Sequence, residues 1–148
     1  MLLRRDRAMT AIGIVLDVAF HAGRSGSASA AEIAERLGQA RRGIEPVLQA
    51  LVRAKLLASV RGPHGGYRLG RAQRDLSLAE IVDAAVDGDG AGTPVQDRLQ
   101  AAVTVPLWDE LDQLCQRHFS ALTVDDLLRR AAAAGITRPT SEPLDFAI

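Results

Sequence analysis

The stretch that decides the fold class is Val60-Arg61-Gly62-Pro63-His64-Gly65-Gly66-Tyr67-Arg68-Leu69. Its centre is rich in Gly and Pro, which are typical of turns, and after the turn the apolar Tyr67 and Leu69 alternate with Arg68. Alternating residues on either side of a Gly/Pro turn predict a β-hairpin. The tip of this hairpin is basic, because it carries Arg61 and His64.

Helical patterns precede the hairpin. The first has apolar residues at helical spacing, with an expected buried face of Met9, Ile12, Val15, Leu16, Ala19 and Phe20. The second begins at Ser29-Ala30-Ala31-Glu32, a capping box in which side-chain oxygens accept hydrogen bonds from backbone N–H groups, and it ends at Gly38. The third carries Ile44, Val47, Leu48, Leu51 and Val52 on one face. Helix, turn, helix and basic hairpin predict a mainly α winged helix-turn-helix with a two-stranded β wing.

The composition is that of one globular domain. Hydrophobic residues make up 47% of the 148 residues and charged residues 24%. No apolar run approaches the roughly 18 residues that cross a bilayer, so we expect a cytoplasmic protein with no membrane partner. The single cysteine, Cys115, excludes an internal disulfide and a cysteine-rich metal cluster within one chain.

The charges are distributed unevenly although the formal net charge is zero. Residues 1–75 hold 13 Lys/Arg against 6 Asp/Glu, a net of +7, and residues 76–148 hold 5 against 12, a net of −7. Such asymmetry is expected when one half faces phosphate. Arginine supplies almost all the positive charge, which suits bidentate phosphate and guanine contacts but is equally expected from an arginine-rich genome.

The third helix is the predicted recognition helix. Its candidate base contacts lie off the apolar face: Arg41, Arg42, Glu45 and Gln49. Gly43 and Pro46 are unfavourable inside a helix. Either the regular helix begins late, with Pro46 in its first turn, or it bends near Arg42.

Other candidate DNA contacts lie at the hairpin tip and at helix ends. Those at the tip are Arg61, Gly62, His64, Gly65 and Gly66. Arg61 is expected to enter a minor groove, and Gly65 and Gly66 to permit positive φ and close approach to the sugar-phosphate backbone. His64 is either a solvated turn residue or a phosphate donor. The helix that starts at Ser29 offers N–H groups to a phosphate, and Arg7 belongs either to a solvated N-terminus or to a phosphate clamp.

These features resemble the Rrf family of bacterial winged-helix regulators, which includes the IscR, NsrR and CymR types. The resemblance runs to about Ala131, and its carriers are LDVAFH (16–21), AEIA (31–34), LQAL (48–51) with Leu56-Leu57, the hairpin, and LWDEL (107–111). Family members have a basic residue at the position of Arg7, which favours the clamp. A Ser and an aromatic residue often stand where this chain has Ala40 and Gly43, so the resemblance leaves the operator sequence open.

The resemblance does not extend to the ligands of the family's iron–sulfur cluster. Cluster-binding members carry three cysteines in and after the loop that corresponds to residues 87–93, and some add a histidine where this chain has Val105. No cysteine lies between Asp87 and Pro106. Because cluster iron requires thiolate or comparable ligands, we expect no such cluster and no other cofactor. The loop also lacks the ligand spacing of an EF-hand, so we expect no metal site.

A long helix is predicted from Val105 or Pro106, with a wide apolar stripe at three- and four-residue steps. The stripe consists of Leu107, Trp108, Leu111, Leu114, Cys115, Phe119 and Leu122. It packs either on the chain's own core or, as the resemblance implies, also on a second copy as a dimerisation helix. We expect Cys115 to be a small buried hydrophobe rather than a redox sensor.

The elements around this helix have their own signals. Ser77-Leu78-Ala79-Glu80 is a second capping box, and Thr123 is expected to cap the last helix, with Asp125 and Asp126 in its first turn. A helix over 95–104 is expected to turn Leu99 and Val103 inward. We divide the chain into a DNA-binding region (1–76), a linker and dimerisation region (77–134) and a tail (135–148).

The leading hypothesis is a homodimeric, sequence-specific transcription regulator that binds double-stranded DNA at a palindromic operator, and a repressor by family resemblance. The alternative is a winged-helix module that binds protein and no longer binds DNA. Catalysis is not expected, because Cys115, His118 and Asp112 share one helix and form no substrate cleft. A small-molecule effector, oxidation of Cys115 and a partner protein all remain open as the trigger.

Overall fold

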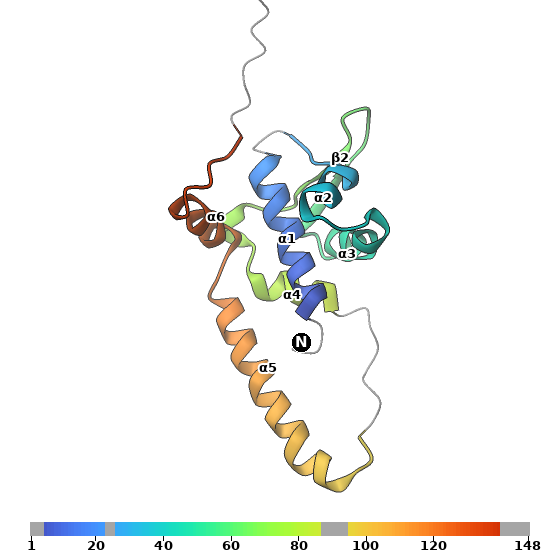
Figure 1. Ribbon diagram of the computed structural model, residues 1–148, viewed down its shortest axis with the longest axis vertical. Helices are drawn as coiled ribbons and strands as arrows, with labels where there is room; N and C mark the ends of the chain where they lie inside the picture. The colour runs from blue at the N-terminus through green and yellow to red at the C-terminus, as the bar shows by residue number, and fades with distance from the viewer. Residues whose placement is uncertain (1–4, 23–25, 87–94, 140–148) are drawn as a thin grey trace, which may run out of the picture.

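The computed structural model describes residues 5–22, 26–86 and 95–139. Figure 1 shows a compact helical body with the hairpin at one side and a long helix projecting from it. The elements are α1 (Arg5–His21), α2 (Ala30–Leu37), α3 (Arg41–Arg53), β1 (Leu57–Val60), β2 (Gly66–Leu69), the 3₁₀ turn η2 (Gln73–Asp75), α4 (Leu78–Val86), the π-helical segment η3 (Gln100–Thr104), α5 (Val105–Ser120) and α6 (Val124–Ala133). The fold is the predicted mainly α winged helix-turn-helix. The loop predicted at 87–93 and most of the tail lie outside the described residues.

α1 lies at the centre of the hydrophobic core and contacts α2, α3, α4 and α6. Its fully buried residues include Ala11, Ile14, Val15 and Val18. The expected buried face was wrong for Met9, whose side chain is 58% exposed. A helix surrounded on several sides buries more than one stripe, so the apolar spacing alone did not fix which residues point inward.

A partly buried ion pair joins α1 to α2. The carboxylate of Asp17, only 7% exposed, accepts two hydrogen bonds from Arg36, each 2.8 Å long. Hydrogen bonding to Asp17 raises the pKa of Arg36. His21 Nε2 lies 3.6 Å from the same carboxylate. This fork geometry fixes the position of the first helix of the helix-turn-helix against the central helix.

Capping boxes begin three helices, as local sequence predicted for the first two. In each box, a Ser or Thr hydroxyl accepts from the backbone N–H of an acidic residue, whose carboxylate accepts from the backbone of the Ser or Thr. The pairs are Ser29 with Glu32, Ser77 with Glu80, and Thr123 with Asp126. The predicted cap at Thr123 is therefore confirmed.

α3 begins at Arg41, so the late-start alternative for this helix was wrong. Its N-cap, Ala40, makes no side-chain capping hydrogen bond, and the Gly43 N–H instead donates to the Ala40 carbonyl at 2.9 Å. Pro46 lies inside the helix rather than in its first turn. Burial of the apolar face, with Ile44, Leu48 and Leu51 each 0% exposed, offsets these local costs.

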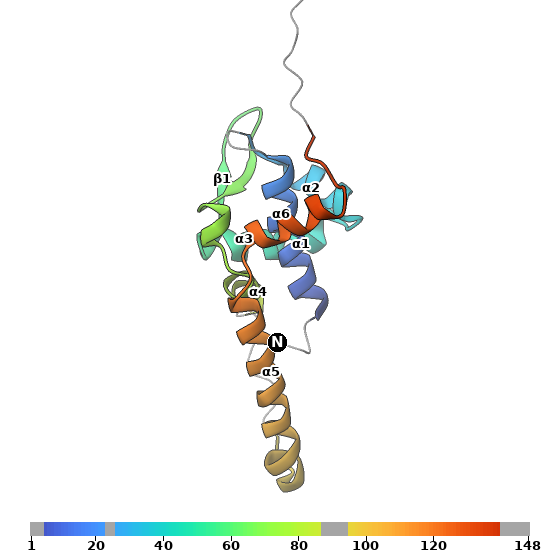
Figure 2. The ribbon, with the colours of Figure 1, turned by 90° about the vertical axis from the view of Figure 1, so that its left-hand side faces the viewer.

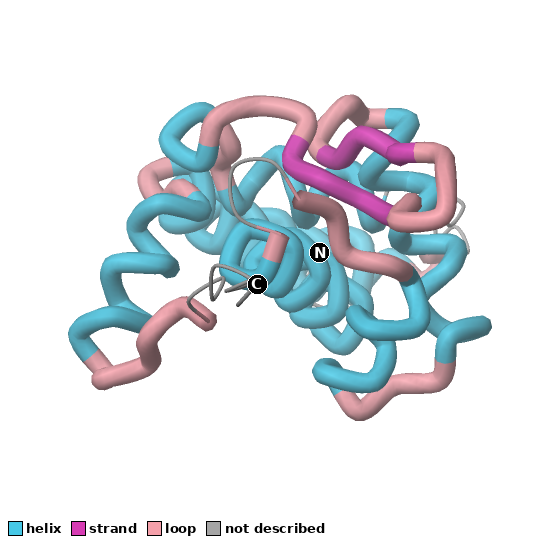
Figure 3. The backbone as a smooth tube through the Cα atoms, turned by 90° about the horizontal axis from the view of Figure 1, so that it is seen from above, coloured by secondary structure: helices cyan, strands magenta, loops and turns pink. Residues whose placement is uncertain are grey.

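The hairpin pairs β1 with β2 in an antiparallel register that sets Ser59 opposite Tyr67 and Ala58 opposite Arg68. Ala28, just before α2, also pairs with Tyr67, so the free edge of β2 is partly covered. Figure 3 shows the two strands at the margin of the helical body. The hairpin thus stands out from the body while its base is held by α3 and by the loop that precedes α2.

The glycines of the hairpin have different roles from those expected. Positive φ occurs at Gly62 (117°), not at Gly65 or Gly66. A Cβ on Gly65 would lie 2.6 Å from the Val60 carbonyl oxygen, and one on Gly66 would lie 2.4 Å from that of Ala28. These two positions require glycine because another part of the same backbone lies against them.

α5 extends away from the body, as Figures 1 and 2 show from two directions. No residue of α5 or η3 is buried. The expectation that Leu99 and Val103 point inward was wrong, since they are 71% and 57% exposed. This end of the helix has no neighbouring element within the described chain to cover it (Figure 1).

After α5 the chain returns to the body. The Leu78 N–H donates to the Leu122 carbonyl at 2.9 Å, and the Val124 N–H donates to the Leu76 carbonyl at 3.0 Å. Val124 and Leu128 of α6 are buried in the same core as α1–α4. None of the described helices combines the length and the apolar character needed to span a membrane.

Candidate nucleic-acid interface

The polar side of α3 is open to solvent along the predicted reading surface. Arg41, Arg42 and Gln49 are exposed. Arg41 Nε lies 3.5 Å from Glu45 Oε1, one turn further along the helix. Arg41 and Glu45 are 65% and 46% exposed, so this pair contributes little to stability and its members can exchange partners for base edges or phosphates.

A groove of about 320 Å³ lies between α3 and the hairpin. Its lining consists of Gln49, Val52 and Arg53 from α3 and of Ser59 and Tyr67 from the strands. Only Gln49 of these was a predicted DNA contact. The alternation of the strand residues put Ser59 and Tyr67 on one face, but the side of the sheet that faces α3 is decided by packing.

The hairpin tip stands clear of the helical body (Figure 1) and presents its basic side chains to solvent. Arg61 and His64 are exposed, and Arg61 makes no ion pair within the residues that the structure describes. Ser27 Oγ donates to the His64 carbonyl oxygen at 2.6 Å. Ser27 and His64 both line an open cavity of about 480 Å³. Arg61 and Arg68 line the same cavity.

The hydroxyl and the backbone N–H of Ser29 both take part in the capping box of α2. Its hydroxyl and its backbone N–H each lie 2.7 Å from Glu32 Oε2, and the backbone hydrogen bond is the main cause that lowers the pKa of Glu32. The Glu32 carboxylate therefore stays charged at the N-terminus of α2. This charge opposes a phosphate at the same place, so any phosphate contact there must use N–H groups further into the helix.

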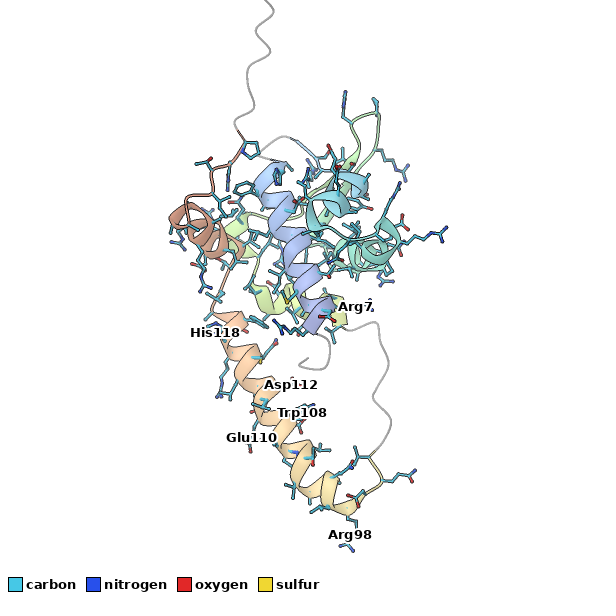
Figure 4. All side chains as sticks on the ribbon, in the orientation of Figure 1. Arg7, Arg98, Trp108, Glu110, Asp112 and His118 are labelled. Carbon is cyan, nitrogen blue, oxygen red and sulfur yellow. The ribbon has the colours of Figure 1, made fainter. Side chains whose placement is uncertain are left out.

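Arg7 lies in the first turns of α1, at the end of that helix remote from the hairpin (Figure 4). Its side chain is partly buried and has interactions of its own. The structure therefore brings together the predicted contacts of α3 and of the hairpin, and it places Arg7 apart from them. A phosphate clamp at Arg7 stays a prediction.

The predicted dimer stripe divides into two parts along α5. Leu107, Trp108 and Leu114 are 49%, 40% and 53% exposed. Phe119 and Leu122 pack against the chain's own core, and Leu111 and Cys115 are partly buried between these groups. A hydrogen bond of 2.8 Å from Gln116 Nε2 to Asp83 Oδ2 fastens the C-terminal part of α5 to α4.

The donor groups do not fit an iron–sulfur cluster. Cys115 is the sole thiol of the sequence, and it lies partly buried on α5. Among the described residues, no group of three His, Cys, Asp or Glu side chains is placed to hold a metal ion. One thiol cannot supply the ligands that cluster iron requires.

Comparison with known proteins identifies the family of this chain. A family model named Rrf2, described as iron-dependent transcriptional regulator, matches residues 5–130. The chain belongs to the Rrf2 family. It is 33% identical over 124 residues to the HTH-type transcriptional regulator IscR of Photobacterium profundum, covering 80% of this chain and 71% of that protein. Protein rrf2 of Nitratidesulfovibrio vulgaris is 29% identical over 125 residues, covering 80% of this chain and 82% of the relative.

Solved structures of the family agree with the fold. The structure of IscR from T. potens superimposes with a TM-score of 0.70 at 27% identity, covering 89% of this chain and 90% of that chain. CymR of B. subtilis, with a TM-score of 0.65 at 22% identity over 84% of this chain and 94% of that one, shares the fold. This Rrf2 protein is therefore a DNA-binding transcriptional regulator and not an enzyme, as the sequence predicted.

Proposed function

We propose that this Rrf2 protein acts in the cytoplasm as a homodimer that binds a palindromic operator and represses transcription without an iron–sulfur cluster. The observation that carries the proposal is the exposed apolar surface of α5. Leu107, Trp108 and Leu114 are large apolar residues on a helix with no buried residue. Contiguous apolar surface of this kind marks an interaction site, and a second copy of the same helix supplies a matching surface.

The reading surface would then occur twice. In a two-fold dimer, the two α3 helices would enter successive major grooves about 34 Å apart, and the hairpins would reach the flanking minor grooves. The exposed Arg41, Arg42 and Gln49 would face base edges, and Arg61 at the hairpin tip would enter the minor groove. A palindromic operator follows from the symmetry of such a dimer.

The DNA-binding part is tested by titrating labelled duplex at several salt concentrations. We expect the logarithm of the affinity to fall linearly with the logarithm of the salt concentration, because bound phosphates release counterions. Arg61→Ala should weaken binding about tenfold. Arg98→Ala, which removes the same charge at the far end of the long helix (Figure 4), is the matched control and should leave affinity unchanged. No interaction at low salt would favour the protein-binding module instead.

Trp108 gives a direct optical test of the dimer, because it is the only tryptophan of the chain. We expect its emission to shift to longer wavelength on dilution, at the concentration where sedimentation reports dissociation. Leu107→Glu should give a monomer at all concentrations that sedimentation can reach. The control is Gln113→Glu, an exposed α5 residue away from the stripe. Repression is tested by a promoter fusion, whose transcription should rise when the gene is removed.

A further inference from the structure

A second basic surface lies on the face of β2 that points away from α3. Tyr67 lines the groove beside α3, so the next residue, Arg68, points to the opposite face of the hairpin. That face borders an open cavity of about 800 Å³. The charged and amide residues of its lining come from segments far apart in sequence: Arg68, Arg71, Gln73 and Arg74, then Asp125 of α6, and Arg138.

The cavity has a net excess of positive charge, since four arginines and one carboxylate line it. Arg71 is held by Glu80, with 2.8 Å between Nη2 and Oε1, and Arg138 Nη2 donates to Gln73 Oε1 at 3.4 Å. Within the described part of the chain, Arg68 and Arg74 make no ion pair. Their guanidinium donors are therefore open to a ligand.

The size and donors of the cavity define a class of ligand. Small-molecule sites commonly have volumes of roughly 300–1,000 Å³. The guanidinium fork matches the paired oxygens of a carboxylate or phosphate. We propose that this cavity binds a small organic anion that carries two or three carboxylate or phosphate groups.

The shape and charge of the lining favour a small anion over the DNA backbone. The cavity opens on the side of the hairpin away from the recognition helix, and the carboxylate of Asp125 inside it repels a continuous row of phosphates. An anion held by Arg68, Arg74 and Arg138 would join the wing to the segment that follows α6. Any effect of the bound anion on operator affinity rests on the proposed function. Binding of the anion to the cavity does not.

The experiment is calorimetric titration of the full chain, without DNA, with citrate as the carboxylate probe and pyrophosphate as the phosphate probe. Ionic strength is held constant with sodium chloride. We expect saturable binding of one probe molecule per chain, and the probe that binds identifies the source of the anionic groups. Arg74→Gln and Arg68→Gln should each weaken binding about tenfold. Asp125→Asn should tighten it about threefold, because a repulsive charge is removed.

Arg98→Gln is the matched control, since it removes one arginine remote from the cavity (Figure 4). Unchanged affinity in this variant supports the site. The proposal is overturned if neither probe gives saturable heat, or if Arg98→Gln weakens binding as much as Arg74→Gln. It is also overturned if Arg74→Gln, without either anion, weakens DNA binding as strongly as Arg61→Ala. Saturable probe binding with no DNA binding would remove the proposed function and leave this site intact.

Discussion

Gly66 and Ala28 are packed so closely that a Cβ on Gly66 would lie 2.4 Å from the Ala28 carbonyl oxygen. The adjacent Tyr67 exchanges two backbone hydrogen bonds with Ala28, of 2.9 Å and 2.8 Å. Ala28, two residues before α2, thereby forms an isolated β-bridge on the free edge of the hairpin. The wing is consequently positioned by the start of the helix that precedes the recognition helix.

Replacing Gly66 with Ala should therefore disturb the wing. We expect Gly66→Ala to lower the free energy of unfolding by about 2 kcal/mol, because backbone must move to make room for the methyl group. Gly43→Ala is the matched control, since nothing lies within 4 Å of a Cβ at that helical position. It should raise the free energy by about 0.5–1 kcal/mol. Urea unfolding measures both, and equal effects would contradict the packing described here.

Lys55 gives a second stability prediction. α3 ends in a Schellman motif, with Leu56 N–H bonded to the Leu51 carbonyl and Lys55 N–H bonded to that of Val52. Lys55 has a φ of 59°, and it is the sole non-glycine residue with positive φ among those described. Lys55→Gly should raise the free energy of unfolding by about 1 kcal/mol. Lys55→Ala keeps the unfavourable φ and should change it little, so an equal gain from both would contradict the explanation.

Breaking the ion pair between Asp17 and Arg36, which joins α1 to α2, should lower the free energy of unfolding by more than breaking an exposed ion pair with the same N–O distance. Asp17→Asn leaves the Arg36 guanidinium beside a neutral group in a partly buried place. We expect the free energy of unfolding to fall by about 2 kcal/mol. This is less than for a fully buried pair, because Arg36 is 30% exposed. Arg71→Gln breaks the exposed pair with Glu80, whose N–O distance is also 2.8 Å, and should cost less than about 1 kcal/mol. Thermal and urea unfolding of both variants compare them.

The capping boxes predict how stability depends on pH. The backbone N–H of Ser29 is the main cause that lowers the pKa of Glu32, the Arg71 guanidinium that of Glu80, and the backbone N–H of Thr123 that of Asp126. Each carboxylate binds protons more weakly in the folded state. Its contribution is therefore complete above the ordinary pKa, 4.5 for Glu and 3.8 for Asp, and is lost as pH falls through the lower folded value.

The free energy of unfolding should accordingly fall steeply as the pH is lowered below about 4.5. The triple variant Glu32→Gln, Glu80→Gln and Asp126→Asn should be less stable at pH 7 and should lose less on acidification. Urea unfolding at pH 7, 4.5 and 3 measures the difference. Parallel profiles for the two proteins would show that these carboxylates do not cause the acid sensitivity.

Local signals predicted the parts of this fold that depend on neighbours in sequence. Ser29-Ala30-Ala31-Glu32 and Ser77-Leu78-Ala79-Glu80 satisfy backbone groups within four residues, so their capping boxes could be read directly. The hairpin was visible for the same reason. Helix was also expected on both sides of Val105, and the structure continues from η3 into α5 with Thr104 in the helical conformation. The basic stretches predicted the exposed arginines of α3 and of the wing.

The errors concern relationships between distant segments. Gly66 is required by the approach of Ala28, which no pattern within the hairpin encodes. Met9 was placed inward because it shares the apolar spacing of α1, but spacing does not state whether another element covers that position, and Met9 is 58% exposed. Leu99 and Val103 are exposed because a periodic apolar pattern does not state whether the covering surface belongs to the same chain. The groove that joins Gln49 to Tyr67 likewise exists only after the strands pack on α3.

The backbone pairing of Leu76 and Leu78 with Val124 and Leu122 makes a stiff junction between the body and α5. In the proposed dimer, the length of α5 would then set the distance between the two half-sites. Because each helical residue adds about 1.5 Å and turns the chain by about 100°, one inserted residue in α5 would put the two halves out of phase with the double helix. Seven inserted residues would nearly restore the direction in which each half faces, because seven steps of about 100° are close to two full turns, but they would also move each half by about 10 Å along the axis of α5.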